Sequence, residues 1–398
     1  MRVPPHVLSL ALLGALVALV SVFFLFPNVE SEIMTYPELA EIDEGTPRSF
    51  QELSIYFRKL SEEKGAEYAF EVLLRASLPP DTDLHLLGHT VGSMLYKQQG
   101  IAAITTCTQD FRNACSHSVV IGILSDYGEG SLPTIAETCK EAPGGSGAYT
   151  MCFHGLGHGI LAYTGYELEQ AISMCKKTGT SAYRNREYIE CVGGTIMEMI
   201  DGVHDRVAWE QQVERYFKDE DPLYPCSASF VPEEVRTICY DYLTPHLFTV
   251  AGGSDYSTDM YKRAFTLCDS LTGKNREACY GGFGKEFVGL AKKRDVRNIG
   301  SMTEEELLNI RTWCALADDK GGEASCNEHA LASLFWGGEN LPDASLIFCR
   351  IAETKEQGAC YAELAGQIRQ YLGNTNRGVA LCGQLPDLYR KGCEESVL

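Results

Sequence analysis

Residues 264–291 read AFTLCDSLTGKNREACYGGFGKEFVGLA, and this stretch decides the fold. An apolar segment ends near Cys268, a polar loop follows, and Cys279 opens a second segment that continues with Tyr and several Gly residues. We interpret the two segments as antiparallel helices joined by a short loop. A cysteine in the last turn of one helix then lies close to a cysteine in the first turn of its partner, within the ~5.5–6 Å Cα separation that a disulfide requires.

The same arrangement recurs along the chain. Residues 344–372 read ASLIFCRIAETKEQGACYAELAGQIRQYL, and residues 171–200 read AISMCKKTGTSAYRNREYIECVGGTIMEMI. The first cysteine of each pair returns every 32 to 51 residues, a period typical of helical repeat arrays. No long alternation of apolar and polar residues indicates a sheet. The sequence therefore predicts an all-α fold, an array of disulfide-stapled helical hairpins that resembles an α-solenoid.

The cysteines fall into eight local pairs with spacings of 8 to 16 residues. An even number of cysteines without any CxxC motif favours disulfides over zinc sites and indicates an oxidising compartment. We expect each pair to close one hairpin and to contribute roughly 2–4 kcal/mol to stability. The predicted bridges are Cys107–Cys115, Cys139–Cys152, Cys175–Cys191, Cys226–Cys239, Cys268–Cys279, Cys314–Cys326, Cys349–Cys360 and Cys382–Cys393.

Paired cysteines in helical hairpins resemble the cysteine-rich repeats of the Sel1 and tetratricopeptide type. The resemblance covers residues 45–398 in architecture only, because the cysteine spacing varies and the usual repeat consensus is absent. The motifs HLLGH, CSH and CFHGLGHG are also similar to those of uncharacterised extracytoplasmic Cys/His-rich helical-repeat proteins. The resemblance implies the fold and carries over no activity and no catalytic residue.

The N-terminus predicts membrane attachment. Residues 7–26 carry no charge and match the ~20 residues that cross a bilayer, so we expect a transmembrane anchor. Arg2 before this segment, with Glu30 and Glu32 after it, indicates a cytoplasmic tail at 1–6 and an extracytoplasmic body. Residues 27–47 are then a linker and residues 48–398 the repeat domain. A cleaved signal peptide is the alternative, although the apolar run exceeds the usual ~7–15 residues.

Five histidines mark three consecutive predicted units. His85 and His89 form one H-x-x-x-H pair, and His154 and His158 form another; residues four apart share one face of a helix. His117 follows its cysteine by two residues, as His154 does, so it occupies the equivalent place in the unit between the pairs. Imidazole suits Zn, Cu or Fe, and the sequence predicts a divalent transition metal site.

The number of ions depends on the curvature of the array. Packed helices lie ~8–10 Å apart, so in a straight array the two pairs are separated by about twice that distance. One shared ion therefore requires strong curvature, with His117 near the centre. Otherwise two sites form, each completed by water or by a carboxylate such as Asp83 or Glu198.

The next unit adds carboxylates. Glu198 stands seven residues beyond Cys191, near the position that His158 holds in its own unit, and Asp201 and His204 follow. Glu198 is our candidate catalytic base beside a metal that activates water. The structural alternative is that these histidines only pack helices, which is the role we expect for His246 and His329.

Charge and motifs restrict the functions that remain. The chain has a net charge of −20 and no long basic stretch, so we expect no nucleic-acid partner. No phosphate-binding loop or HExxH motif is present. The first hypothesis is a membrane-anchored extracytoplasmic protein with a His-rich metal site and metal-dependent catalysis. The alternatives are a disulfide-stabilised scaffold for a protein or peptide partner, and a haem or metal carrier.

Overall fold

A computed structural model describes residues 36–43, 48–79, 81–218, 220–253, 256–337, 343–372 and 375–397, and within these ranges the chain is all-α. The only extended pairing in them is an isolated bridge between Lys218 and Asp221. The α-helices are α2 (Glu38–Asp43), α3 (Phe50–Lys64), α4 (Ala66–Arg75), α5 (Leu84–Gln99), α6 (Asp110–Tyr127), α7 (Leu132–Lys140), α8 (Gly145–Tyr163), α9 (Leu168–Cys175), α10 (Arg186–Asp201), α11 (Arg206–Tyr216), α12 (Glu233–Tyr242), α13 (Thr244–Gly252), α14 (Thr258–Thr266), α15 (Gly273–Ala291), α16 (Glu304–Cys314), α17 (Glu323–Gly337), α18 (Asp343–Arg350), α19 (Thr354–Gln367), α20 (Asn376–Cys382) and α21 (Asp387–Val397).

Local sequence explains where several helices begin. Ser49 caps α3 and Thr303 caps α16, each in a capping box with a glutamate three residues later that satisfies free amides of the first turn. Asp83 accepts a hydrogen bond from the amide of Leu86 and starts α5. Helices α4 and α5 match the segments expected from the sequence at 65–76 and 81–99.

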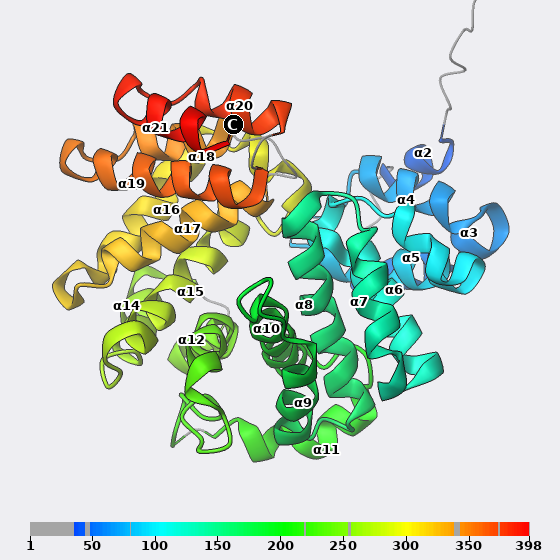
Figure 1. Cartoon of the computed structure of the whole chain (residues 1–398). Helices are drawn as coiled ribbons and strands as arrows, with labels where there is room; N and C mark the ends of the chain where they lie inside the picture. The colour runs from blue at the N-terminus through cyan, green and yellow to red at the C-terminus, as the bar shows by residue number, and fades with distance from the viewer. Residues whose placement is uncertain are drawn as a thin grey trace, which may run out of the picture.

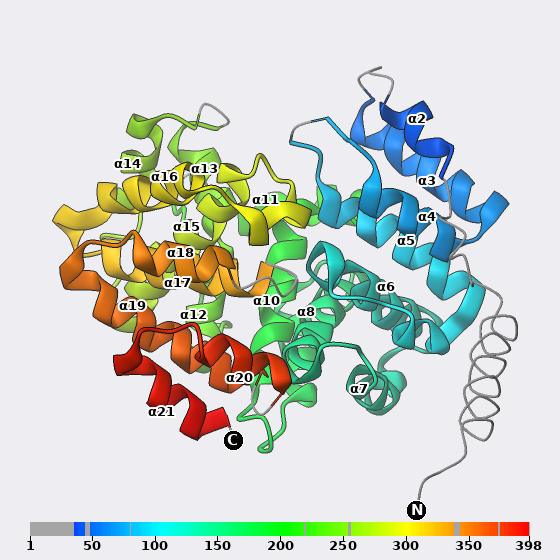
Figure 2. The same ribbon diagram turned by 90° about the horizontal axis from the view of Figure 1, so that it is seen from above.

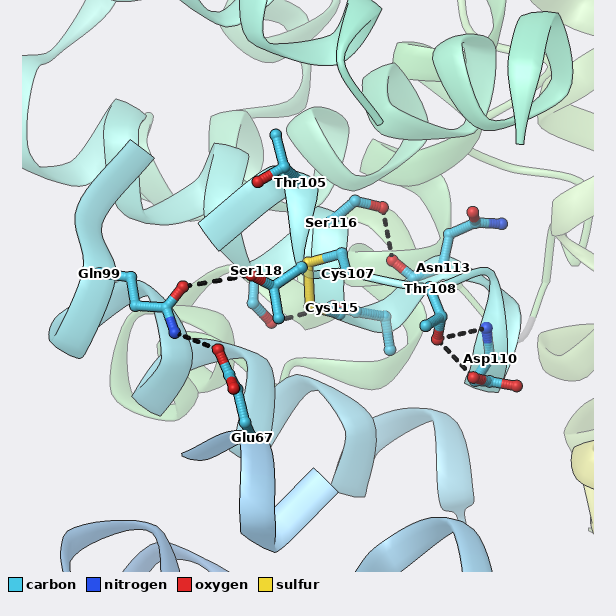
Figure 3. Close-up of a disulfide and its surroundings, with 12 residues drawn as sticks. Glu67, Gln99, Thr105, Cys107, Thr108, Asp110, Asn113, Cys115, Ser116 and Ser118 are labelled. Carbon is cyan, nitrogen blue, oxygen red and sulfur yellow. Dashed lines mark hydrogen bonds between the residues drawn. A yellow bond between two sulfur atoms is a disulfide. The ribbon is translucent and has the colours of Figure 1, made fainter. Parts of the chain in front are cut away.

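All eight predicted disulfides are present, and each closes a local helix pair. The Cα separations lie between 5.4 and 5.9 Å, as a hairpin end supplies. Figure 3 shows the first bridge, Cys107–Cys115, which joins the chain after the 3₁₀ helix η1 (Gly100–Thr105) to α6. No cysteine is free. Disulfides in this number suggest an extracytoplasmic location.

The second helices of successive pairs pack side by side in one row. Helix α8 packs on α6 and α10, and α15 packs on α12 and α17. Glycines make the closest of these contacts: a Cβ on Gly194 of α10 would lie 1.9 Å from the carbonyl oxygen of His154 on α8. In return, a Cβ on Gly157 would lie 2.0 Å from the carbonyl oxygen of Cys191. The glycines that follow the second cysteines therefore allow backbone-to-backbone packing between units.

The row bends until its ends meet. Helices α6, α8, α10, α12, α15 and α17 contact one another in order, and α17 returns to α6, which closes a ring. Figure 1 shows these helices following one another around the centre, with α14 at the outer edge. Figure 2 shows α2–α5 and α20–α21 on different sides of this ring. The predicted sequential stacking of hairpins is confirmed, but an open solenoid-like array would not bring α17 back to α6.

Long-range hydrogen bonds join the two ends of the row. Arg112 at the start of α6 donates to the hydroxyl of Ser333 on α17 at 3.4 Å. Arg297, in the 3₁₀ helix η5 (Val296–Ser301), donates to the carbonyl oxygen of Ala76 at 2.6 Å. The amide of Asp81 donates to the carbonyl oxygen of Lys293 at 3.0 Å. These bonds connect residues more than 200 positions apart.

The predicted cytoplasmic tail and anchor, residues 1–26, lie outside the described residues. Among the helices that the structure describes, none combines the length and the apolar character needed to span a membrane. Helix α2 falls within the stretch expected as a linker, and it is docked on the body. The carboxylate of Glu38 pairs with Lys64 and accepts a hydrogen bond from Tyr68 at 2.7 Å.

Candidate metal centre

Six histidines from four neighbouring segments converge inside the first half of the ring. His85 and His89 come from α5, His117 from α6, and His154 and His158 from α8. These five side chains are buried. His204 follows α10 and is 18 % exposed.

Close helix packing brings the rings together. A Cβ on Gly155 of α8 would lie 2.5 Å from the Cα of His117, so the absence of a side chain there lets α8 approach α6 at the level of the histidines. Ring centroids of neighbouring histidines are then 4.7 to 6.1 Å apart. His117 contacts both pairs, at 5.5 Å from His85 and 5.7 Å from His154, and holds the central position that the sequence predicts.

Two overlapping groups have the spacing of metal ligands. In the first group, one ring nitrogen each of His85, His117 and His158 lies within 4.8 Å of the others. In the second, the ligand atoms of His158, Glu198 and His204 meet the same limit. His158 belongs to both groups. The structure thus joins α5, α6 and α8 around one point, and α10 supplies a carboxylate beside it.

Hydrogen bonds set the orientation of two rings in the first group. The Nδ1 of His85 lies 2.6 Å from the carbonyl oxygen of Phe111, which can only accept, so Nδ1 carries the proton and Nε2 keeps a free lone pair. The Nδ1 of His158 lies 3.2 Å from Oε2 of Glu198, a carboxylate oxygen that again requires a donor. Both rings are therefore held in the tautomer that leaves Nε2 available to a metal.

A strained turn supports the first of these bonds. Phe111, Arg112 and Asn113 have φ values of 53°, 55° and 63°, in the left-handed region that residues other than glycine rarely adopt. This turn places the Phe111 carbonyl against His85 and directs Arg112 toward α17. Strain of this kind costs of order 1–3 kcal/mol per residue and clusters at functional sites.

His89 adds a fourth imidazole next to the first group. Its Nε2 lies 3.2 Å from the Nε2 of His85, and its Nδ1 lies 3.3 Å from the hydroxyl of Ser118. The hydroxyl also lies within bonding distance of two carbonyl oxygens, those of His89 and Ala114. If Ser118 donates to a carbonyl, Nδ1 of His89 is the donor and two lone pairs face each other at Nε2. In that arrangement a proton or a cation between the nitrogens relieves the contact; in the other neutral tautomer Ser118 donates to Nδ1 and the Nε2–H of His89 donates to Nε2 of His85.

Several buried ring nitrogens have no hydrogen-bond partner of normal geometry. They include Nε2 of His158 and Nδ1 of His154. Neither nitrogen of His117 has such a partner, although the Met151 backbone interacts with this ring. A buried polar atom left unsatisfied costs roughly 1–3 kcal/mol, so native proteins rarely keep several in one place without a ligand.

The protonation states suit a metal. Burial lowers the pKa of His85 to about 4. Burial and the neighbouring imidazoles hold the pKa values of His89 and His117 well below the usual range. Burial also lowers the pKa of His158, although Glu198 opposes that effect. These rings are neutral at pH 7, which is the form that coordinates metals.

Glu198 is saturated with hydrogen-bond donors. Its carboxylate accepts from the rings of His158 and His204, from the hydroxyl of Tyr166, and from the amide of His204 at 3.0 Å. Burial raises the pKa of Glu198, but the hydrogen bonds from His158 and His204 outweigh it and hold the pKa well below its usual range. The side chain is fully buried and anionic.

The predicted histidines do not all occupy one shell. The structure groups His85, His117 and His158, with His89 adjacent. His154 belongs to neither group, and its ring is tilted against that of Tyr242, with the centroids 4.9 Å apart. His204 completes the second group. The sequence placed it near Glu198, but only the fold of the α10–α11 connection brings its ring against His89 and His158.

The other two histidines among the residues that the structure describes lie apart from these groups. His246 stacks on Phe217 at 4.3 Å. His329 pairs with Asp241 at 2.6 Å, in a second polar cluster that sequence reasoning missed because its members are far apart in the chain.

Comparison with known proteins identifies no relative. No protein-family model, no curated protein and no solved structure matches this chain. The structure shows an all-helical body of eight disulfide-bonded helix pairs, and this body holds buried histidine groups that could bind a metal ion.

Proposed function

We propose that this protein binds one divalent transition metal ion through His85, His117 and His158, within an extracytoplasmic body that residues 7–26 anchor to the membrane. One observation carries the metal proposal: three buried imidazoles from three helices present nitrogens within 4.8 Å of one another. Nitrogens around a tetrahedral zinc ion, each 2.0–2.1 Å from the metal, are about 3.4 Å apart. Small side-chain movements bring the three rings to that spacing.

The surrounding groups fit the coordination chemistry of neutral imidazole. His85 and His158 donate through Nδ1 to a carbonyl and a carboxylate, the usual outer-shell partners of metal-binding histidines. His89 is the nearest fourth donor, since its Nε2 adjoins that of His85. The negative charge of Glu198 offsets the charge of the cation. Three neutral nitrogens beside one carboxylate favour Zn, Cu or Fe over Mg or Ca.

In this proposal Glu198 positions His158 and His204. Because four hydrogen bonds already occupy its carboxylate, the group is a weak base that an incoming proton reaches only after those bonds rearrange. Its assignment as a general base stays a prediction. A divalent ion held by three imidazoles with an open position would supply Lewis acidity to a substrate oxygen, the basis for metal-dependent catalysis.

Metal content of the purified protein tests the proposal. The protein with intact disulfides is stripped with a chelator, loaded with Co²⁺, and followed by elemental analysis and visible absorption. We expect about one ion per chain with a tetrahedral nitrogen-ligand spectrum. His158→Gln should lose both signals. His246→Gln is the matched control, because His246 is also ring-stacked but lies outside the cluster.

Two results would overturn the proposal. One is a wild-type chain that takes up no stoichiometric Co²⁺, Zn²⁺ or Cu²⁺. The other is equal metal content in wild type, His85→Gln and His158→Gln. The scaffold for a protein or peptide partner then becomes the preferred function. A haem carrier is distinguished by Soret absorption after incubation with haem, which the metal-only site does not give.

A further inference from the structure

A pocket of about 900 Å³ lies outside the histidine cluster, none of whose six histidines lines it. Its walls come from the loop before α10 and the first residue of α10, from α17, and from α19 together with the π-helix η7 (Ile368–Leu372) that follows it. The volume falls in the range of small-molecule sites. The residues before and at the start of α10 lie more than 130 positions before those of α17 and α19, so the pocket is a product of the closed ring.

One wall carries a histidine held by a buried carboxylate. The Nδ1 of His329 lies 2.6 Å from Oδ1 of Asp241, so this nitrogen is the donor and Nε2 is the ring atom left for the pocket. The His329 side chain is 34 % exposed, whereas that of Asp241 is 11 % exposed. A Cβ on Gly281 would lie 2.4 Å from the His329 ring, so the ring packs flat against α15.

Lys285 is the third member of the cluster formed with Asp241 and His329. Lys285 on α15 donates to Oδ2 of Asp241 at 2.9 Å and lies 3.3 Å from the centroid of the Tyr242 ring. Asp241 is thus paired with Lys285 and hydrogen-bonded to His329. Burial lowers the pKa of His329, but the charge and hydrogen bond of Asp241 outweigh it and raise the pKa above its usual value. The charge of Glu328 also raises the pKa of His329, and the charge of Lys285 lowers it.

The pocket is locally cationic in an acidic protein. Arg184, Arg186 and Arg369 line it, against Glu328 and Glu363. The chain as a whole has a net charge of −20, so an excess of arginine in one pocket runs against the composition. Arg184 and Arg369 are exposed, and Arg184 has a φ of 54°, in the left-handed region, in the loop that leads into α10.

We propose that this pocket binds a small organic anion that carries a carboxylate or phosphate group, with the arginines as its counter-charges and the protonated ring of His329 as a hydrogen-bond donor through Nε2. Guanidinium groups bind both kinds of oxyanion through paired hydrogen bonds. A purely structural Asp–His pair needs no ring nitrogen facing an open pocket, and the arginines are not required to neutralise Asp241, which Lys285 already pairs. The site stands independently of metal binding, because no residue of either metal group lines the pocket.

Calorimetric titration of metal-free, disulfide-intact protein tests this site. Citrate and inorganic phosphate are the two probes. We expect saturable binding of at least one of them with one site per chain. Stronger binding of citrate assigns a carboxylic acid ligand, and stronger binding of phosphate assigns a phosphorylated one.

Variants locate the binding. His329→Gln and the double variant Arg184→Gln with Arg369→Gln should each weaken the better probe at least tenfold. Arg350→Gln is the matched control, since Arg350 is exposed and pairs with Glu304 on another surface. If His329→Gln fails to fold, the exposed arginine pair still decides the question. Absence of saturable binding by both probes, or equal affinity in the arginine double variant and wild type, rejects the proposal.

Discussion

His158 and Glu198 face each other across the α8–α10 interface, with Nδ1 of the imidazole 3.2 Å from Oε2 of the carboxylate. This contact links the two metal-ligand groups, because His158 is the residue that they share. The close packing of α10 on α8 makes this contact possible, because the glycine contacts at Gly157 and Gly194 bring the two side chains within hydrogen-bonding distance. Backbone packing and site geometry are thus set by the same interface.

Replacing Glu198 by Gln should weaken metal binding about 10–100-fold, the usual effect of removing a partner that orients a metal-binding histidine. Zinc affinity measured by competition with a chromogenic chelator checks this. Glu187→Gln is the matched control, since Glu187 is equally buried on the same helix but accepts from Tyr149 and Thr180 instead. Equal losses in the two variants would show a general packing defect rather than a role for Glu198.

The stability of the metal-free protein should fall as the pH drops from about 6.5 to about 4. The pKa of His85 is lowered to about 4 in the folded state, so between these pH values the unfolded chain binds more protons than the folded one. The loss is of order 1 kcal/mol per pH unit for each histidine of this kind. Denaturant unfolding at a series of pH values measures it. The slope should decrease in His85→Gln, and an unchanged slope would contradict the burial of neutral histidines.

Gly194→Ala should destabilise the protein by roughly 1–3 kcal/mol or more, since its Cβ would lie 1.9 Å from the His154 carbonyl oxygen and neither backbone can yield without moving a helix. Gly289→Ala is the comparison. Gly289 lies on α15 with nothing within 4 Å of its Cβ position, and alanine there should be neutral or stabilising by up to about 1 kcal/mol. Thermal unfolding of both variants distinguishes the two expectations. Similar midpoints would argue against the tight α8–α10 contact.

Removing the disulfide beside the histidines should affect stability and metal binding together. The pair Cys139–Cys152 closes a loop with a sequence separation of 13, and its loss is worth roughly 3 kcal/mol. Cys152 lies two residues before His154 on α8, so a looser helix start also loosens the site. The double variant Cys382→Ser with Cys393→Ser removes a bridge of similar span at the C-terminus. It should lower stability while leaving Co²⁺ uptake intact; loss of uptake in both double variants would point to global unfolding.

Local pattern made much of the fold predictable. Each cysteine pair lies within 16 residues, so hairpin geometry alone limits its partner, and all eight pairs form as expected. Equivalent positions after the second cysteine placed His117 between the two H-x-x-x-H pairs. The ring closure could not be predicted, because it depends on contacts such as Arg112 with Ser333, 221 positions apart, that leave no periodic trace.

Parts of the histidine cluster and of the Asp241–His329 pair could not be predicted either, because the local sequence pattern does not indicate them. The turn at Phe111–Asn113 is left-handed although it contains no glycine, so the sequence does not indicate it. The turn nevertheless supplies the carbonyl oxygen that orients His85. His329 looked like a solitary helix residue, because its partner Asp241 is 88 positions away on α12. Such pairs exist only after the helices have been arranged around a common centre.

The bonds from Arg297 to the carbonyl oxygens of Leu73 and Ala76 have a thermodynamic consequence. In an open repeat array each unit contacts only its neighbours, so stability is nearly a sum of local terms and the ends fray first. In this protein, the bonds from Arg297 make the segment around Leu73 and Ala76 a direct neighbour of η5, although the two are far apart in the sequence. Unfolding of either one removes support from the other, which couples the whole circuit into one cooperative transition. Deleting one helical hairpin therefore opens the closed ring and destabilises the remaining hairpins, including those that carry the histidine cluster and the Asp241–His329 pair.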